Sequence, residues 1–188
     1  AFNVSRTPIR HVLKLLKHEK IVEVIPKKGI FIYEPTFKEV LEAFQIRKAL
    51  ELEAVRVASL NPNKEKIKEI EELTYLEERY YEKFDYEKGN SITTSVHLEI
   101  AKLSGNDMLY DYCKEIGEKI SIYLGFYDHQ RENFPCAHEH RQILKAIKEG
   151  NSEEAQSLME LHTQRVIEDL KFHKNETVNI KEIFKPIK

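Results

Sequence analysis

Residues 1–32 read AFNVSRTPIRHVLKLLKHEKIVEVIPKKGIFI and carry the signals of one helix and two short strands. Ser5 is a favourable helix N-cap, and Pro8 falls in the first turn, where its fixed φ and missing N–H are tolerated. Apolar residues then recur at helical spacing until two β-type runs begin, at 21–25 and 30–33. The stretch therefore predicts a helix followed by a hairpin with a basic Pro-Lys-Lys-Gly turn.

The rest of the chain predicts helices. Pro35 interrupts the pattern, and Thr36-Phe37-Lys38-Glu39 has the form of a capping box, so we place a domain boundary at 34–36. Asn61-Pro62 and Ser152 are interpreted as helix caps. The helices expected after the boundary cover 37–60, a charged stretch from Asn61-Pro62 to about 84, 87–104, 107–127, 138–149 and 152–173, with a loop at 128–137.

Charge is distributed unevenly along the chain. Seven lysines and arginines against three glutamates give residues 1–35 a formal charge of +4, which leaves −6 for the remainder because the whole chain carries −2. A basic end on an acidic body suggests an anion-binding module joined to a part with a different task. No apolar run approaches the ~18 residues of a membrane span. Two cysteines, Cys113 and Cys136, are too few for a disulfide framework. We expect a cytoplasmic protein with reduced thiols and no membrane partner.

Two arginines lie on one face of the first predicted helix. Arg6 and Arg10 are four residues apart, and Ser5 and Thr7 lie beside them at the helix N-terminus. Backbone N–H groups, small hydroxyls and guanidinium groups together suit phosphate oxygens and guanine edges in a major groove. A solvated basic face would show the same arginines, so the pair alone leaves both interpretations open.

The order of the residues narrows this choice. The run F-N-V-S-R-T-P-I-R-H-V-L, followed by I-V-E-V-I-P-K-K-G-I-F-I, resembles the second half of the winged helix-turn-helix of the GntR family of bacterial transcription regulators. The resemblance implies that 5–18 is the recognition helix and that Lys28 and Gly29 reach the minor groove from the wing tip. The DNA contacts that it implies on the helix are Ser5, Arg6, Thr7 and Arg10. Two further helices of that domain are expected before Ala1, so we expect the chain to be part of a longer product.

Three histidines of the acidic body lie on apolar helix faces. His97, His140 and His162 each share one side of a predicted helix with aliphatic residues, and Arg47 does the same. Taken singly, an inward histidine is more often a core residue with a hydrogen-bond partner than a ligand. Burying several imidazoles without partners costs about 1 to 3 kcal/mol each. A metal ion or an anionic ligand would satisfy them together.

Four segments of the helical body carry a second resemblance. They are Q-I-R-K-A-L-E at 45–51, V-H to S-G-N at 96–106, E-H-R-Q-I-L-K-A-I at 139–147 and M-E-L-H at 159–162. These segments are similar to the ligand-binding domain of the FadR-type branch of GntR regulators, in the subgroup called FCD. In that subgroup an Asp and three His bind a divalent metal, and a small carboxylate binds beside it.

Mapped onto this sequence, the resemblance implies a metal site at His97, His140 and His162, with Arg47 as the partner of a carboxylic acid effector. The family's Asp is replaced by Thr93, whose hydroxyl we assign to the effector side of the site. Three neutral imidazoles still form a competent divalent site with open positions. Zinc or nickel is the expected metal, with manganese as a further candidate.

These features predict a mainly α fold. It consists of a partial winged helix-turn-helix at 1–35, an antiparallel all-α bundle of about six helices at 36–174 and a tail at 175–188. The predicted function is a homodimeric, ligand-responsive regulator that binds operator DNA and is not an enzyme. Two alternatives stay open. One is a metal-dependent enzyme on a helical bundle, although the sequence places no evident general base beside the histidines. The other is a ligand-binding or dimerisation module that does not bind DNA in this form.

Overall fold

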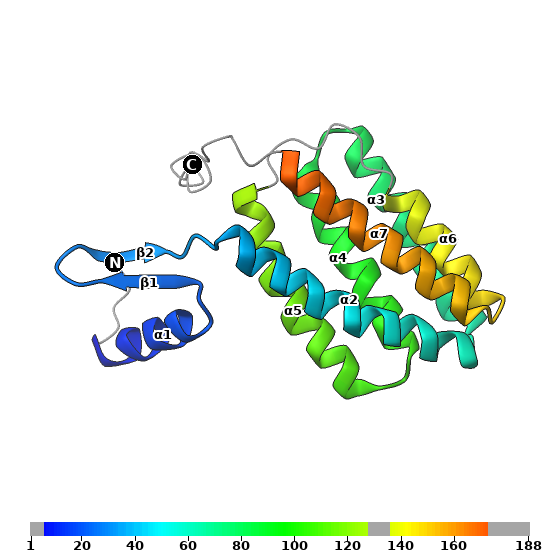
Figure 1. Ribbon diagram of the computed structural model, residues 1–188, viewed down its shortest axis with the longest axis horizontal. Coiled ribbons are helices and arrows are strands. Elements are labelled where there is room, and N and C mark those ends of the chain that lie inside the picture. Colours follow the sequence, from blue (N-terminus) through cyan, green and yellow to red (C-terminus); the bar gives the residue numbers. More distant parts are fainter. Residues whose placement is uncertain (1–5, 128–135, 173–188) are drawn as a thin grey trace. The chain divides into compact units, whose positions relative to one another are not determined.

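The computed structural model describes residues 6–127 and 136–172, and the chain divides after Thr36 into two compact units. The first unit is a helix with a two-stranded antiparallel wing (Figure 1): α1 (Arg6–His18), β1 (Val22–Ile25) and β2 (Gly29–Ile32). Val22 pairs with Ile32, and Ile25 pairs with Gly29. Gly29 has a φ of +124°, which glycine adopts without a steric penalty. The backbone conformation of the turn therefore explains why glycine occupies this position. The predicted N-cap, Ser5, lies outside the described residues.

The second unit is a helical bundle. Its described helices are α2 (Phe37–Leu60), α3 (Lys64–Glu82), α4 (Tyr86–Leu103), α5 (Asp107–Tyr127), α6 (Cys136–Lys148) and α7 (Ser152–Phe172). Helix α2 packs against α4, α5, α6 and α7, while α3 packs against α4 and α6. The predicted fold, a helix with a two-stranded wing followed by a bundle of about six helices, is confirmed.

Several predicted helix ends differ from the observed ones by one or two residues, and the starts of α3, α7 and α6 are examples. The cap of α3 is Asn63 and not Asn61-Pro62, because the side chain of Asn63 accepts a hydrogen bond from the backbone N–H of Lys66 at 3.1 Å. The cap of α7 is Asn151 and not Ser152, since Asn151 Oδ1 accepts from the N–H of Glu154 at 3.2 Å. Helix α6 begins at Cys136, so the predicted loop ends two residues earlier than expected, and its residues 128–135 lie outside the described part.

The bundle has two main apolar clusters with a polar layer between them. The large cluster contains buried residues of α2, α3, α4, α6 and α7, such as Val55, Ile67, Ile100, Ile143 and Met159. The small cluster contains buried residues of α2, α5, α6 and α7, such as Phe44, Ile120, Cys136 and Val166. The polar layer comprises Arg47, Glu51, Glu77, His97, Glu139, His140 and His162. Along α7, for example, His162 lies between Met159 of the large cluster and Val166 of the small one.

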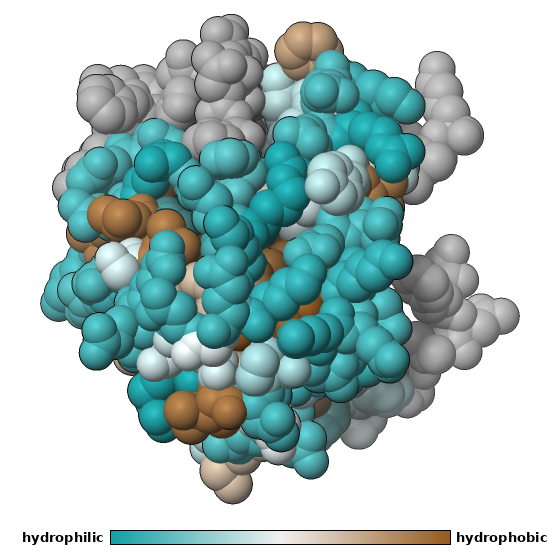
Figure 2. Space-filling view, turned by 90° about the vertical axis from the view of Figure 1, so that its right-hand side faces the viewer, coloured by the Kyte–Doolittle hydropathy of each residue, from teal (hydrophilic) through white to brown (hydrophobic). Residues whose placement is uncertain are grey.

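The surface is consistent with this inward placement of apolar residues. The face in Figure 2 is mostly hydrophilic, with hydrophobic side chains in separate small groups. Helix α3 is an instructive case, because its charged sequence resembles a fully solvated helix, yet it buries Ile67, Ile70, Thr74 and Glu77. No helix in the described part of the chain is long and apolar enough to cross a lipid bilayer.

Candidate metal and effector site

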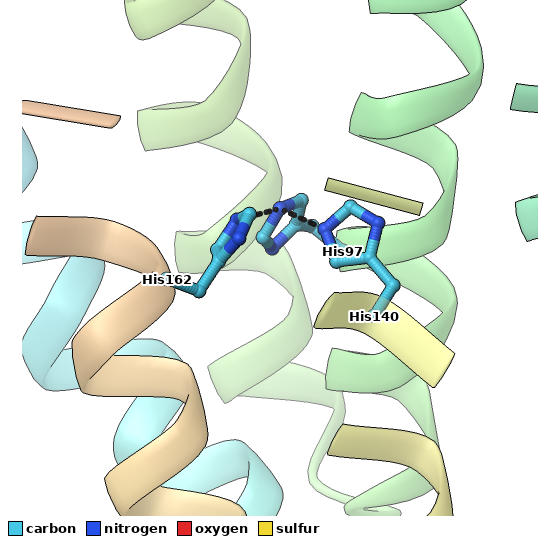
Figure 3. A group of neighbouring side chains, drawn as sticks. All are labelled: His97, His140 and His162. Carbon is cyan, nitrogen blue, oxygen red and sulfur yellow. Dashed lines mark hydrogen bonds between the residues drawn. The ribbon is translucent and has the colours of Figure 1, made fainter. Parts of the chain in front are cut away.

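The structure brings the three predicted histidines together at the centre of the bundle. His97 comes from α4, His140 from α6 and His162 from α7, and their imidazoles converge (Figure 3). Nε2 of His97 lies 3.1 Å from Nε2 of His140 and 3.2 Å from Nε2 of His162. All three side chains are buried, and His140 is 0% exposed. Three nitrogen donors from three helices therefore face one point.

Local sequence explains why each ring points inward. His140 precedes Ile143, Leu144 and Ile147 at helical spacing, and these residues are fully buried in the large cluster. His97 and His162 lie beside buried residues of the same kind, Ile100 and Met159. A helix that buries its aliphatic stripe buries the histidine on that stripe as well.

A carboxylate stands behind each imidazole. Oε2 of Glu77 lies 2.9 Å from Nδ1 of His140, and Oε2 of Glu139 lies 2.7 Å from Nδ1 of His162. Oε1 of Glu51 lies 2.9 Å from Nδ1 of His97. Each carboxylate comes from a different helix than its histidine, namely α3, α6 and α2. This outer ring of glutamates is not predicted from the sequence.

The carboxylates decide which nitrogen of each ring carries the proton. An ionised carboxylate only accepts hydrogen bonds, so Nδ1 of His140 and Nδ1 of His162 are N–H donors. Nδ1 of His97 lies 2.9 Å from Oε1 of Glu51 without the geometry of a hydrogen bond, and the charge of that carboxylate favours the proton on the same nitrogen. Each Nε2 atom is then left with a lone pair, and these lone pairs meet at 3.1–3.2 Å. Facing lone pairs repel unless a cation or a proton lies between them. A metal-bound imidazole shows the same arrangement, with Nε2 on the ion and Nδ1–H on a carboxylate.

Electrostatics favours neutral imidazoles here. Burial lowers the pKa of His97 well below its usual range, and the charge of Arg47 lowers it further. Burial and the neighbouring His140 likewise lower the pKa of His162. Burial alone would raise the pKa of Glu51, but Arg47 and His97 outweigh it, so the pKa of this carboxyl lies well below its usual range. Neutral imidazoles beside ionised carboxylates are the protonation state that metal binding requires.

Arg47 and Thr93 line a cavity beside the histidines. Its volume is about 470 Å³, and its lining includes Arg47, Thr93, Thr94, His97, Ser121 and His162. Nε of Arg47 donates to Oε1 of Glu51 at 2.8 Å. Within the described part of the chain, its Nη groups have no hydrogen-bond partner, and they are the groups that could grip a carboxylate. The hydroxyl of Thr93 donates to Oε1 of Glu77 at 2.5 Å, so it is already engaged with the protein.

The predicted DNA-contact residues lie in the first unit. Thr7 and Arg10 are exposed on α1, and Lys28 and Gly29 are exposed at the wing turn. Arg6 begins α1, but its side chain is outside the described part, as is Ser5. The structure thus presents a basic helix and a basic turn to solvent, and their DNA contacts stay a prediction.

The positions of the three glutamates in the sequence give a weak indication of their role. Glu77 continues the stripe formed by Ile67, Ile70 and Thr74, all of which are buried. Glu51 follows Arg47 by four residues, and Glu139 directly precedes His140. An acid on an apolar stripe is a sign of a buried partner, because an unpaired carboxylate is costly to bury.

Comparisons with known proteins identify the class. Residues 1–32 match the profile described as bacterial regulatory proteins, gntR family, and residues 42–165 match the FCD domain. The chain therefore belongs to the GntR family of bacterial transcription regulators and carries an FCD domain as its helical unit. The predicted family is confirmed.

Individual relatives agree with this assignment. An uncharacterized HTH-type transcriptional regulator of Bacillus subtilis, YdhC, is 28% identical over 183 residues, which cover 91% of this chain and 77% of the relative. A second HTH-type regulator, from an unstable DNA locus of Streptomyces ambofaciens, is 26% identical over 178 residues and covers 90% and 72%. The solved structure of Escherichia coli McbR/YncC shares the fold, with a TM-score of 0.76 at 22% identity over 90% of this chain and 86% of that one. The two sequence relatives are transcriptional regulators and not enzymes.

Proposed function

We propose that this transcription regulator holds a divalent metal on Nε2 of His97, His140 and His162 and binds a small carboxylate in the adjoining cavity. Occupancy of the site would alter how the N-terminal unit of a homodimer engages operator DNA in the cytoplasm. One observation carries the proposal: three Nε2 atoms face one point while each Nδ1 faces a carboxylate.

The spacing of the nitrogens supports a metal. Two nitrogens bound to one zinc ion at about 2.0–2.1 Å, with angles of about 90–109°, lie roughly 2.9–3.4 Å apart. The two Nε2 separations from His97, 3.1 and 3.2 Å, fall inside this range, and the ligand atoms of all three histidines lie within 4.8 Å of one another. Imidazole donors suit zinc and nickel, whereas magnesium and calcium prefer oxygen. Zinc or nickel is therefore the proposed ion, and manganese is the next candidate.

The charges of the polar layer, together with Arg165 at its edge, support an anionic effector. Glu51 contacts Arg47 and Glu139 contacts Arg165, while Glu77 contacts neutral groups. Three carboxylates against two guanidinium groups leave one negative charge, which a divalent ion would turn into one positive charge. A monocarboxylate would neutralise it, and a cavity of about 470 Å³ that Arg47 lines has room for such a molecule. Thr93 lies on the wall of the same cavity and is the second proposed effector contact.

The metal part of the proposal is tested by elemental analysis. Protein purified without a histidine tag or added metal should carry zinc or nickel at up to one equivalent per chain. After removal of the metal with a chelator, titration calorimetry with small carboxylates should show weaker binding than in the loaded protein. Arg47→Ala should lower carboxylate affinity and leave most of the metal in place. Metal-free protein that binds carboxylates as tightly as loaded protein would contradict the proposal.

The DNA part is tested with Arg10→Ala in the full-length protein. Loss of a phosphate or base contact should weaken operator binding by about 1–3 kcal/mol or reduce the slope of affinity against salt by about one unit. Lys64→Ala, which removes an exposed cation from the helical unit, is the matched control and should bind as the parent does. The effector should then change operator affinity by about 5- to 150-fold. Equal losses in both variants would contradict the assignment of α1.

A further inference from the structure

The three carboxylates of the polar layer differ in their partners. Glu51 contacts the guanidinium of Arg47, and Glu139 contacts that of Arg165. Glu77 contacts a hydroxyl and an imidazole instead: Oε1 accepts from the hydroxyl of Thr93 at 2.5 Å, and Oε2 lies 2.9 Å from Nδ1 of His140. Within the described residues, no lysine or arginine pairs with Glu77, and its side chain is 0% exposed.

A buried carboxylate without a cation is costly, and hydrogen bonds offset only part of that cost. A cation on the far side of the His140 ring, where Nε2 of His140 faces Nε2 of His97, would compensate Glu77. The negative charge of Glu77 therefore acts on that point through the imidazole.

We propose that Glu77 is the charge-compensating positioning residue of the metal site and that Thr93 holds it in place. This inference rests on the proposed function, because it concerns the same ion. Glu77 fixes His140 with Nε2 toward the metal and supplies negative charge from behind the ring. Thr93 directs Glu77 and leaves the cavity side of the ion free of a carboxylate from the protein.

The packing of α3 against α4 supports this arrangement. Tyr81 lies one turn after Glu77 on α3, and its hydroxyl lies 3.1 Å from the hydroxyl of Thr93. The hydroxyl of Tyr81 also donates to Oδ1 of Asn90 at 2.8 Å. A Cβ atom at Gly89 would lie 2.9 Å from the Tyr81 ring, so glycine is needed for this close approach. Two side chains of α3, Glu77 and Tyr81, thus contact Thr93 and fix its position.

The first test removes the charge and keeps the shape. Glu77→Gln should weaken Zn²⁺ and Co²⁺ binding by about 10- to 100-fold, the usual effect of losing an outer-shell partner of a metal ligand. Glu78→Gln is the matched control, because Glu78 is the next residue of α3, is 43% exposed and pairs with Arg141. Its metal affinity should equal that of the parent. Equal affinities of Glu77→Gln and the parent would overturn the proposal.

The second test moves the charge to the other side of the ring. Thr93 lies one turn before His97 and lines the same cavity, so we expect an aspartate at 93 to bring a carboxylate to the cavity side of the histidines. In the Glu77→Gln background, Thr93→Asp should recover at least about tenfold of the lost affinity, whereas the neutral Thr93→Asn should not. The visible spectrum of bound Co²⁺ should change with Thr93→Asp, which adds an oxygen ligand, and stay similar with Glu77→Gln alone. Failure of the aspartate to outperform the asparagine would show that packing, and not charge, explains the loss.

The two proposals fail in different ways. If the parent protein binds neither Zn²⁺ nor Co²⁺, the proposed function and this inference both fall. If the parent binds both ions and Glu77→Gln binds them equally well, only the role of Glu77 falls.

Discussion

Ile143 and His140 lie one turn apart on α6, and both are 0% exposed, yet they belong to different kinds of interior. Ile143 lies in the large cluster among aliphatic side chains of five helices. His140 lies in the polar layer, between the carboxylate of Glu77 and the ring nitrogen of His97.

The two interiors differ in whether the chain itself supplies every partner that their side chains need. Apolar packing is satisfied by the chain itself, because dispersion and the removal of water need no further partner. The polar layer leaves three lone pairs facing one another and one carboxylate without a cation among the described residues. The cluster should therefore determine stability with or without metal, whereas the layer should determine what the protein binds.

The largest expected effect is that of Ile143→Ala. Loss of a fully buried isoleucine should lower the free energy of unfolding by about 2–5 kcal/mol. The loss should be the same in metal-free and metal-loaded protein, as measured by urea denaturation. Leu60→Ala, at the exposed end of α2, is the control and should cost less than about 0.5 kcal/mol. A loss of stability confined to the metal-loaded form would contradict the claim that the large cluster acts independently of the metal.

His140→Gln should show the opposite pattern. Removal of one of three nitrogen ligands should weaken Zn²⁺ binding by more than about 100-fold, since outer-shell partners alone are worth about 10- to 100-fold. Without metal, the free energy of unfolding should change by less than about 1 kcal/mol, because the glutamine amide can still donate to Glu77. His138→Gln, on the exposed side of the same helix, should change neither quantity. Competition with a chelator and urea denaturation measure the two effects.

Acid should destabilise the metal-free protein through the same layer. The pKa values of His97 and His162 are lowered from the ordinary 6.5, so the unfolded chain takes up protons at a pH where the folded chain does not. Stability should be full above about pH 6.5 and fall below it, by about 1–3 kcal/mol between pH 7.5 and 5.5 for two such groups. Urea denaturation at both pH values in the presence of a chelator checks the sign, and a rise in stability on acidification would contradict it.

The smallest effect is expected at the edge of the layer. Arg165 contacts Glu139, but its side chain is 51% exposed, so solvent screens the pair. Arg165→Gln should change Zn²⁺ affinity by less than about threefold, far less than Glu77→Gln at the buried end. A loss of Zn²⁺ affinity as large as that of Glu77→Gln would show that the effect of a substitution in the layer does not depend on how deeply the residue is buried.

Much of the fold could be predicted because it depends on local patterns. The wing follows from two β-type runs around a Lys-Lys-Gly turn, and the helices follow from apolar spacing. Helix starts were less certain, since Asn61, Asn63, Asn151 and Ser152 are all good caps and only the backbone path decides which side chain reaches a free N–H.

The site divides in the same way. The pattern of residues is enough to place His97, His140 and His162 on apolar stripes, because helical periodicity places a residue on a face without reference to other helices. The meeting of their Nε2 atoms, and the position of Glu51, Glu77 and Glu139 next to the Nδ1 atoms, could be seen only in the folded protein. Those contacts depend on how closely separate helices approach and at what rotation, and interhelical geometry is set by the packing of the whole bundle and not by the pattern of any one segment.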